Sequence, residues 1–202
     1  MCWAMYLFTD NKLEEIQYNH DNPSMYIENI MYDSDEYISL SKWNANKRNI
    51  YYLESSEGCG CGWRNPCYHG ESYNDEIKYC FNEIDNLKNK FIDINIENIR
   101  KELSDNNIKC SENEIHEIIH RRKNMCEDKI KNYEDDIKKL NENIKDRNDL
   151  YKLFKTTNFD GSYIIICWEG DQGEEIEEII KLDIEKIKDV NYEFCELVKY
   201  IL

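Results

Sequence analysis

Residues 162–168 read Ser-Tyr-Ile-Ile-Ile-Cys-Trp (SYIIICW), and this run decides the fold class. It is apolar at nearly every position, as expected for a strand whose sheet is covered on both faces. Other candidate strands lie at 2–8 (CWAMYLF), 48–55 (RNIYYLES), 176–182 and 192–202, and the type of 176–182 is ambiguous. We expect an α+β or α/β fold with a small sheet of about four to five strands.

The middle of the chain is helical in pattern, because it lacks glycine and proline from 74 to 155 and is densely charged. Apolar residues recur there at steps of three and four, which is a heptad seam in two arms. The residues at 104–107 (SDNN) separate the arms, and Ser111 with Glu114 forms a capping box that restarts a helix. The seam comprises Ile77, Cys80, Ile84, Leu87, Phe91 and Ile94, then Cys126, Ile130, Tyr133, Ile137, Leu140, Ile144, Tyr151 and Phe154.

These patterns predict a long antiparallel helical hairpin, coiled-coil-like, inserted into a sheet domain. Residues 1–72 and 160–202 would form the α/β body, and 73–158 the hairpin, whose second arm spans ~40 residues or ~60 Å. A helix of that length projects from a small domain unless it pairs with another molecule. We therefore expect the hairpin to serve homodimerisation or docking of a partner.

The charge balance narrows the function classes. The chain has 42 acidic and 26 basic residues and a net charge of −16. This opposes direct nucleic-acid binding and association with anionic membranes. The first residues, MCWAMYLFTD, carry no signal peptide, and no run of ~18 apolar residues predicts a membrane span. Nine cysteines without a secretion signal indicate reduced thiols in a cytoplasmic, acidic protein. An acidic surface that occupies a partner's nucleic-acid cleft stays an open hypothesis.

Residues 57–64 read EGCGCGWR and follow a predicted strand. Alternating glycines permit close approach of a ligand or a neighbouring chain. Three interpretations stay open: a packing turn, a redox or nucleophilic cysteine pair, and a zinc site made by Cys59, Cys61, Cys67 and His69. The spacing of this donor set is tighter than in common zinc knuckles. Glu57 and Trp63 flank the cysteines as ligand-binding candidates.

A second candidate turn, Cys167-Trp168-Glu169-Gly170-Asp171, ends the 162–168 strand. Two carboxylates beside an aromatic ring could bind a cation, a sugar or an amine, and an acidic hairpin turn is the alternative. Cys2 lies near the start of the first strand. Convergence of Cys2, Cys59, Cys61 and Cys167 is therefore conceivable.

Residues 116–120 spell His-Glu-Ile-Ile-His, which is similar to the signature of zincin metalloproteases. That signature lies on a buried helix, whereas here Glu114 precedes it and 121–123 (RRK) follows it. No third ligand stands out downstream, and His116 continues the heptad seam. We interpret the pair His116 and His120 as a chance motif.

The two ends of the chain resemble a family of small uncharacterised bacterial proteins. Its members begin Met-Cys with a Thr-Asp turn, carry a Gly-Cys-Gly-Cys-Gly-aromatic segment and end with a Cys-Trp-acidic-Gly-Asp turn. The resemblance covers 1–64 and 160–202 and implies no activity. It emphasises the following residues over Cys67 and His69: Cys2, Cys59, Cys61, Cys167, Trp168 and Asp171.

We expect a non-enzymatic binding protein that recognises a small polar ligand or a protein partner at the surface of 57–64 and 167–173. An inhibitor in host–phage conflict fits this profile. The alternative is an enzyme with Cys59 or Cys61 as nucleophile or metal ligand. Its acid or base would be Glu57, Glu169 or Asp171. A zinc metalloprotease through the HEIIH motif is a remote alternative.

Overall fold

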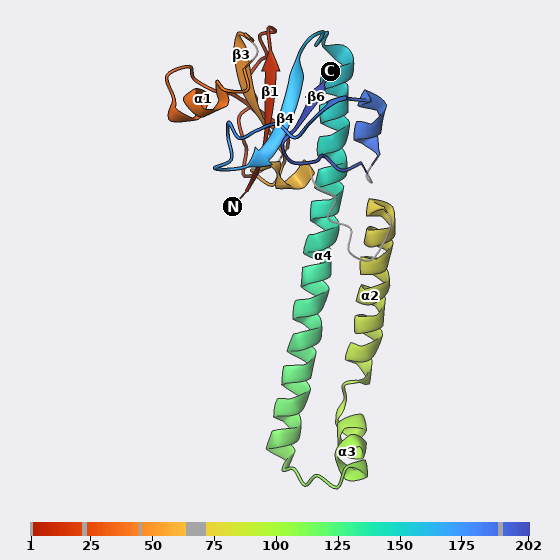
Figure 1. Cartoon of the computed structure of the whole chain (residues 1–202). Helices are drawn as coiled ribbons and strands as arrows, with labels where there is room; N and C mark the ends of the chain where they lie inside the picture. Colours follow the sequence, from red (N-terminus) through yellow and green to blue (C-terminus); the bar gives the residue numbers. More distant parts are fainter. Residues whose placement is uncertain (1, 22–23, 45, 64–71, 190–191) are drawn as a thin grey trace. The chain divides into compact units, whose positions relative to one another are not determined.

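The computed structural model describes residues 2–21, 24–44, 46–63, 72–189 and 192–202. The chain divides into two compact units (Figure 1). The first, called here the sheet unit, comprises Met1–Cys67 and Leu140–Leu202; the second, the helical unit, comprises Tyr68–Lys139. Within the described residues, no helix is both long and apolar enough to cross a membrane.

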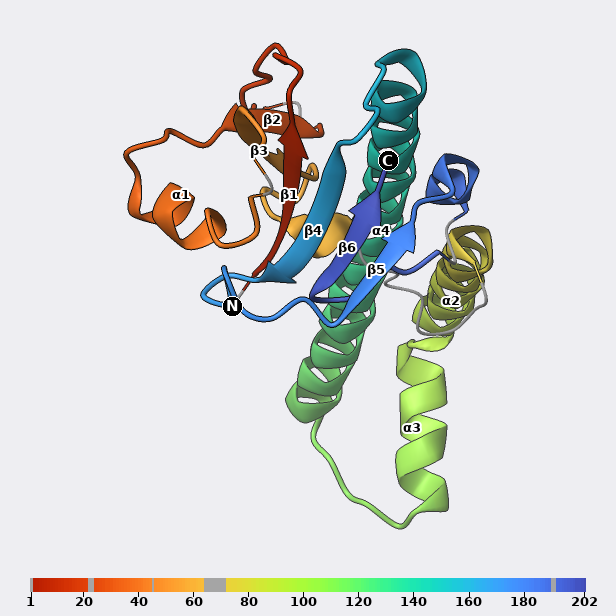
Figure 2. The same ribbon diagram turned by 45° about the horizontal axis from the view of Figure 1, so that its top comes forward.

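The fold is mixed α+β with a six-stranded sheet in the order β2-β3-β1-β4-β6-β5 (Figure 2). The expected four to five strands were too few because β2, a four-residue edge strand, carries no apolar run. Only β5 and β6 pair in parallel, so the α/β alternative was wrong. The strands are β1 (Trp3–Thr9), β2 (Tyr26–Asn29), β3 (Asn49–Glu54), β4 (Tyr163–Trp168), β5 (Glu178–Lys181) and β6 (Val198–Ile201).

The central strands are covered on both faces, as their apolar sequences predicted. Every residue of β1 is buried. Leu150 and Phe154, near the end of the long helix α4 (Glu112–Thr156), join the core on one face. Leu40 of the short helix α1 (Asp35–Leu40) joins the core on the other. Two 3₁₀ turns, η1 (Gly60–Trp63) and η2 (Ile184–Lys188), complete this unit.

In the predicted first arm the structure has two helices, α2 (Tyr73–Asp93) and α3 (Ile96–Asp105). Ile94 leaves helical geometry with a ψ of 79°, and Asn95 caps α3 by accepting a hydrogen bond from the Asn98 backbone N–H. No glycine or proline marks this break, which is why the sequence predicted one continuous arm. The predicted long helix is confirmed, with 45 residues in α4.

The capping box at the start of α4 is also confirmed. The Glu114 carboxylate accepts the Ser111 backbone N–H at 2.6 Å, and the Ser111 hydroxyl accepts the Glu114 N–H at 3.3 Å. Within the helical unit α2 and α4 contact each other, for example where the Tyr79 and Tyr133 rings meet edge to face with centroids 6.3 Å apart. Regular coiled-coil packing of these helices stays a prediction.

Candidate functional site

The start of β1 brings the two predicted turns together. The backbone N–H of Glu169 donates to the Cys2 carbonyl at 2.9 Å, and the Trp3 N–H points at the Cys61 sulfur, 3.5 Å away. The sulfur atoms of Cys2, Cys59 and Cys61 all lie within 4.8 Å of one another. We call these three residues the thiol triad. Part of the predicted convergence is therefore present.

Glycines shape the turn that carries two of the three thiols. After β3 the chain reverses at Gly58, whose φ of +74° is disfavoured for side-chain-bearing residues. Gly60 then lies against the start of β1, where an added Cβ would be only 2.7 Å from the Trp3 carbonyl oxygen. The Ser55 hydroxyl donates to the Cys59 carbonyl at 2.7 Å. These constraints fix Cys59 and Cys61 beside Cys2.

The three thiols are half-buried. Burial raises the pKa of Cys59 well above its ordinary range, and its neighbours Cys61 and Cys2 raise it further because like charges repel. A protonated thiol is a poor nucleophile, so this environment opposes Cys59 as a thiolate nucleophile near neutral pH. A bound metal cation would instead favour the thiolate form of Cys59, because metal coordination requires and stabilises the thiolate.

Glu54, the last residue of β3, is a fully buried carboxylate beside this cluster. Neither of its oxygens accepts a hydrogen bond of normal geometry among the described residues. Burial raises its pKa to about 9; the Tyr52 hydroxyl lowers it in part, and Glu169 and Cys61 raise it again. Glu54 is therefore protonated at neutral pH.

A polar network continues from Glu54 across the same face of the sheet. The Tyr52 hydroxyl donates to Glu169 at 3.3 Å, and the Tyr6 hydroxyl donates to Glu36 of α1 at 2.7 Å. The two tyrosine rings stack with centroids 5.3 Å apart. The side-chain amide of Gln172, from the turn after β4, donates to the Tyr6 hydroxyl at 3.0 Å. The network ties the turn after β4 to α1 and to β3.

Two of the predicted ligand-binding residues belong to the core instead. Trp63 is fully buried and its indole N–H donates to the Leu53 carbonyl at 3.0 Å. Cys167 is also fully buried, outside the thiol triad, and burial raises its pKa to about 12. Neither side chain faces an open surface.

The other predicted residues lie closer to the surface. Trp168 is half-buried and meets Trp3 edge to face, with ring centroids 5.5 Å apart. Glu57 and Glu169 are exposed, and Glu57 accepts a hydrogen bond from Asn143 at 3.3 Å. Asp171 is partly exposed, and its backbone N–H donates to the Trp168 carbonyl. Trp168 and Glu169 adjoin Trp3 and Cys2 at the start of β1. The side chains of Trp168, Glu57, Glu169 and Asp171 all lie outside the thiol triad.

Two predicted metal ligands, Cys67 and His69, lie outside the described residues. His116 and His120 of the HEIIH motif are exposed on α4. In the described ranges, the thiol triad is the one group of three or more His, Cys, Asp or Glu side chains close enough to share a metal ion.

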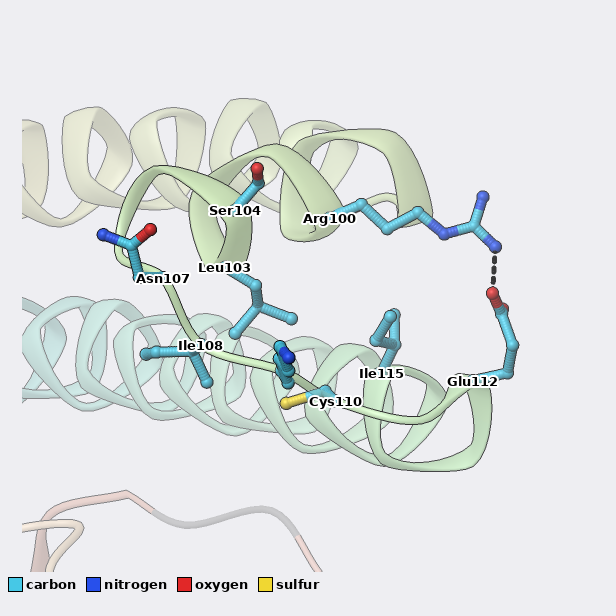
Figure 3. Close-up of a pocket in the computed structure, with 9 residues that line it drawn as sticks. Arg100, Leu103, Ser104, Asn107, Ile108, Cys110, Glu112 and Ile115 are labelled. Atoms are coloured by element: carbon cyan, nitrogen blue, oxygen red, sulfur yellow. Dashed lines mark hydrogen bonds and ion pairs between the residues drawn. The ribbon is translucent and has the colours of Figure 1, made fainter.

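The helical unit has a separate hollow of about 690 Å³ between the end of α3 and the start of α4 (Figure 3). Leu103, Ile108 and Ile115 line it, and an ion pair between Arg100 and Glu112 crosses it on one side. The rest of its lining is Ser104, Asn107, Lys109 and Cys110. It has no evident metal or catalytic chemistry.

Sequence reasoning missed Glu54, Tyr6 and Gln172. Glu54 had a usable signal: it closes an apolar strand (NIYYLE) immediately before the glycine turn, where a buried carboxylate is unusual. Tyr6 and Gln172 had none, because their contact depends on the antiparallel pairing of β1 and β4.

Comparison with known proteins adds no assignment. No family model, curated protein or solved structure matches this chain. The resemblance of its two ends to small bacterial proteins stays a prediction.

Proposed function

We propose that the sheet unit binds a thiophilic metal ion, with Zn²⁺ the best match, at the thiol triad. The observation that carries this proposal is the approach of three sulfur atoms, from two distant chain segments, to within 4.8 Å of one another. Zn²⁺ bound tetrahedrally at about 2.3 Å from each sulfur holds its sulfurs about 3.8 Å apart. The triad needs only a small contraction to reach that geometry.

The donor set favours zinc over hard cations. Thiolates select soft or borderline ions, whereas Mg²⁺ and Ca²⁺ take oxygen ligands. The half-buried positions of Cys2, Cys59 and Cys61 leave the site accessible to an incoming ion. Metal binding would displace the Cys59 thiol proton that burial otherwise retains.

The first experiment measures metal content. Protein purified under reducing conditions with added Zn²⁺ should carry one equivalent after gel filtration, and the variant Cys59→Ser/Cys61→Ser should carry less than a tenth of that. Cys195→Ser, an exposed cysteine outside the triad, is the matched control and should keep the metal. An unchanged zinc content in the double variant would overturn the proposal.

A second experiment asks what completes the coordination shell. Four-coordinate zinc needs one ligand beyond the triad. X-ray absorption of the loaded protein counts sulfur neighbours: three sulfurs with one oxygen indicate a water or substrate position. Four sulfurs, lost in Cys67→Ser, or an imidazole signal, lost in His69→Ala, indicate a closed structural site.

We also propose that the metal-organised surface serves recognition rather than catalysis. The exposed carboxylates of Glu57 and Glu169 beside the triad suit a small polar ligand or a protein partner, and the acidic composition suits an inhibitor of a basic partner.

The helices of the helical unit would act as a hairpin for docking or homodimerisation. Light scattering across a concentration series tests the dimer, and native mass spectrometry tests for a co-purified ligand. A cysteine- or metal-dependent enzyme is the alternative, favoured only if the fourth zinc position is water.

A further inference from the structure

The helical unit contains a second, smaller pocket that the proposed metal function does not use. It lies between α2 and α4 and has a volume of about 340 Å³. Leu87 and Ile94 line it from the α2 side, and Met125 and Cys126 line it from α4. Its interior is therefore mostly apolar.

The pocket arises where packing between the two helices is interrupted. Helix α2 ends at Asp93, and the backbone of Ile94 turns out of helical geometry before α3 begins. Opposite this break the buried residue on α4 is Cys126, whose short side chain fills little space. Met125 remains 54% exposed although it is large and apolar. The hollow is a packing gap with an adaptable methionine at its edge.

The rim of the pocket is cationic. Lys90, Arg122 and Lys129 line it, and no carboxylate does so among the described residues. The Arg122 guanidinium is already engaged by both carboxylate oxygens of Glu102, at 2.7 and 2.8 Å. The ammonium groups of Lys90 and Lys129 therefore supply the positive charge available to an incoming anion. The chain as a whole has a net charge of −16, so the positively charged rim of this pocket is opposite in sign to the rest of the molecule.

We propose that this pocket binds a small amphipathic monocarboxylate, of the fatty-acid type. Its hydrocarbon would lie against Leu87, Ile94 and Cys126, and its carboxylate would meet Lys90 and Lys129. The volume is at the lower end of the roughly 300–1,000 Å³ range of ligand pockets, which favours a medium chain over a long one. This inference is independent of the metal site, since every residue it uses belongs to the helical unit.

The test uses the full-length protein and decanoate. Calorimetry should show saturable binding with one site per chain. Met125 is the one methionine in residues 68–139, so its methyl resonance reports on the pocket when methionine methyls are labelled with ¹³C. That resonance should shift with decanoate and be absent from Met125→Leu. Lys90→Gln/Lys129→Gln should weaken binding at least tenfold, whereas the exposed control Lys88→Gln should change it less than twofold.

Three outcomes would overturn the inference. Decanol binding as tightly as decanoate would show that the cationic rim plays no part. Unchanged affinity in Cys126→Phe, with helical content intact by circular dichroism, would show that the hydrocarbon lies elsewhere. A Met125 resonance that responds to protein concentration but not to decanoate would show that a second copy of the chain covers the pocket.

Discussion

Glu54 is the residue whose chemistry departs most from its ordinary behaviour. A glutamate with no exposed surface and no hydrogen-bond partner of normal geometry cannot keep a charge at low energetic cost. Burial and the nearby carboxylate of Glu169 raise its pKa to about 9, so folding favours the protonated form. In the unfolded chain the same group ionises near its ordinary value of about 4.3. Folding is therefore coupled to proton uptake at this position.

This coupling predicts how stability depends on pH. Because the folded-state pKa is raised, the stabilising contribution of protonated Glu54 is complete at low pH and is lost as pH rises toward about 9. Relative to Glu54→Gln, wild type should lose up to about 1.4 kcal/mol of unfolding free energy per pH unit between roughly pH 5.5 and 8.5. Urea unfolding in reductant and chelator, at each pH, measures the difference.

The matched control is Glu28→Gln, an exposed carboxylate on the neighbouring strand β2. Its stability should track wild type at every pH. Parallel curves for wild type and Glu54→Gln would show that Glu54 is ionised in the fold, and the carboxylate would then need a partner that the described residues do not supply.

At the level of elements, apolar runs identified β1, β3, β4 and β6, left the type of the β5 segment ambiguous and missed β2, and the absence of glycine and proline identified the helical middle. These signals could not show which strands pair or in what order they lie in the sheet. Cys2 meets Cys59 and Cys61 because β1 lies between β3 and β4, and that order is not encoded locally. The helix break at Ile94 was also not predictable from the local sequence, because it depends on how the chain turns there. Asn95 is an effective helix cap only once the chain has already turned.

Arg147 shows how one side chain joins several elements. It interrupts the apolar seam of α4 and is only 1% exposed. Its guanidinium donates to the carbonyls of Trp63 at 2.7 Å, Asp189 at 3.0 Å and Tyr192 at 2.9 Å. The η1 turn and the segment after η2 are thereby fixed to α4. The sequence pattern marked this residue as an interruption but could not show what it contacts.

Removing this group should be strongly destabilising. Arg147→Met preserves the volume but removes three charge-assisted hydrogen bonds, each worth about 1.5–3 kcal/mol when buried. The bond to the Trp63 carbonyl is buried, whereas those to Asp189 and Tyr192 are partly buried, and the Asp189 carbonyl keeps the Tyr192 N–H as a donor. We expect a loss of about 3–5 kcal/mol in the free energy of urea unfolding. The control is Lys145→Met, at an exposed position two residues earlier on the same helix. It should lower the free energy of unfolding by less than about 0.5 kcal/mol. A loss below about 1 kcal/mol in Arg147→Met would mean that these carbonyls find water instead.

At the scale of the whole molecule, the excess of 42 acidic over 26 basic residues should oppose folding through self-repulsion. Added salt screens this repulsion and also the exposed ion pairs, such as Lys155 with Glu185 at 3.0 Å. Exposed ion pairs stabilise the fold by only about 0–1 kcal/mol each. The stabilisation gained by screening the repulsion should therefore exceed the stabilisation lost by screening these pairs. We expect the thermal midpoint to rise by about 2–4 °C between low salt and about 0.3 M NaCl, which corresponds to roughly 1 kcal/mol for a chain of this size.

A charge variant separates screening from a general salt effect. Glu175, shortly before β5, and Glu178, the first residue of β5, are exposed and have no ion-pair partner among the described residues. Replacing both with glutamine should raise the low-salt midpoint and reduce the salt-induced rise. Calorimetry of both proteins across the salt series measures this. Equal salt responses would show that NaCl acts through the hydration of apolar surface, because removal of two negative charges leaves that contribution unchanged.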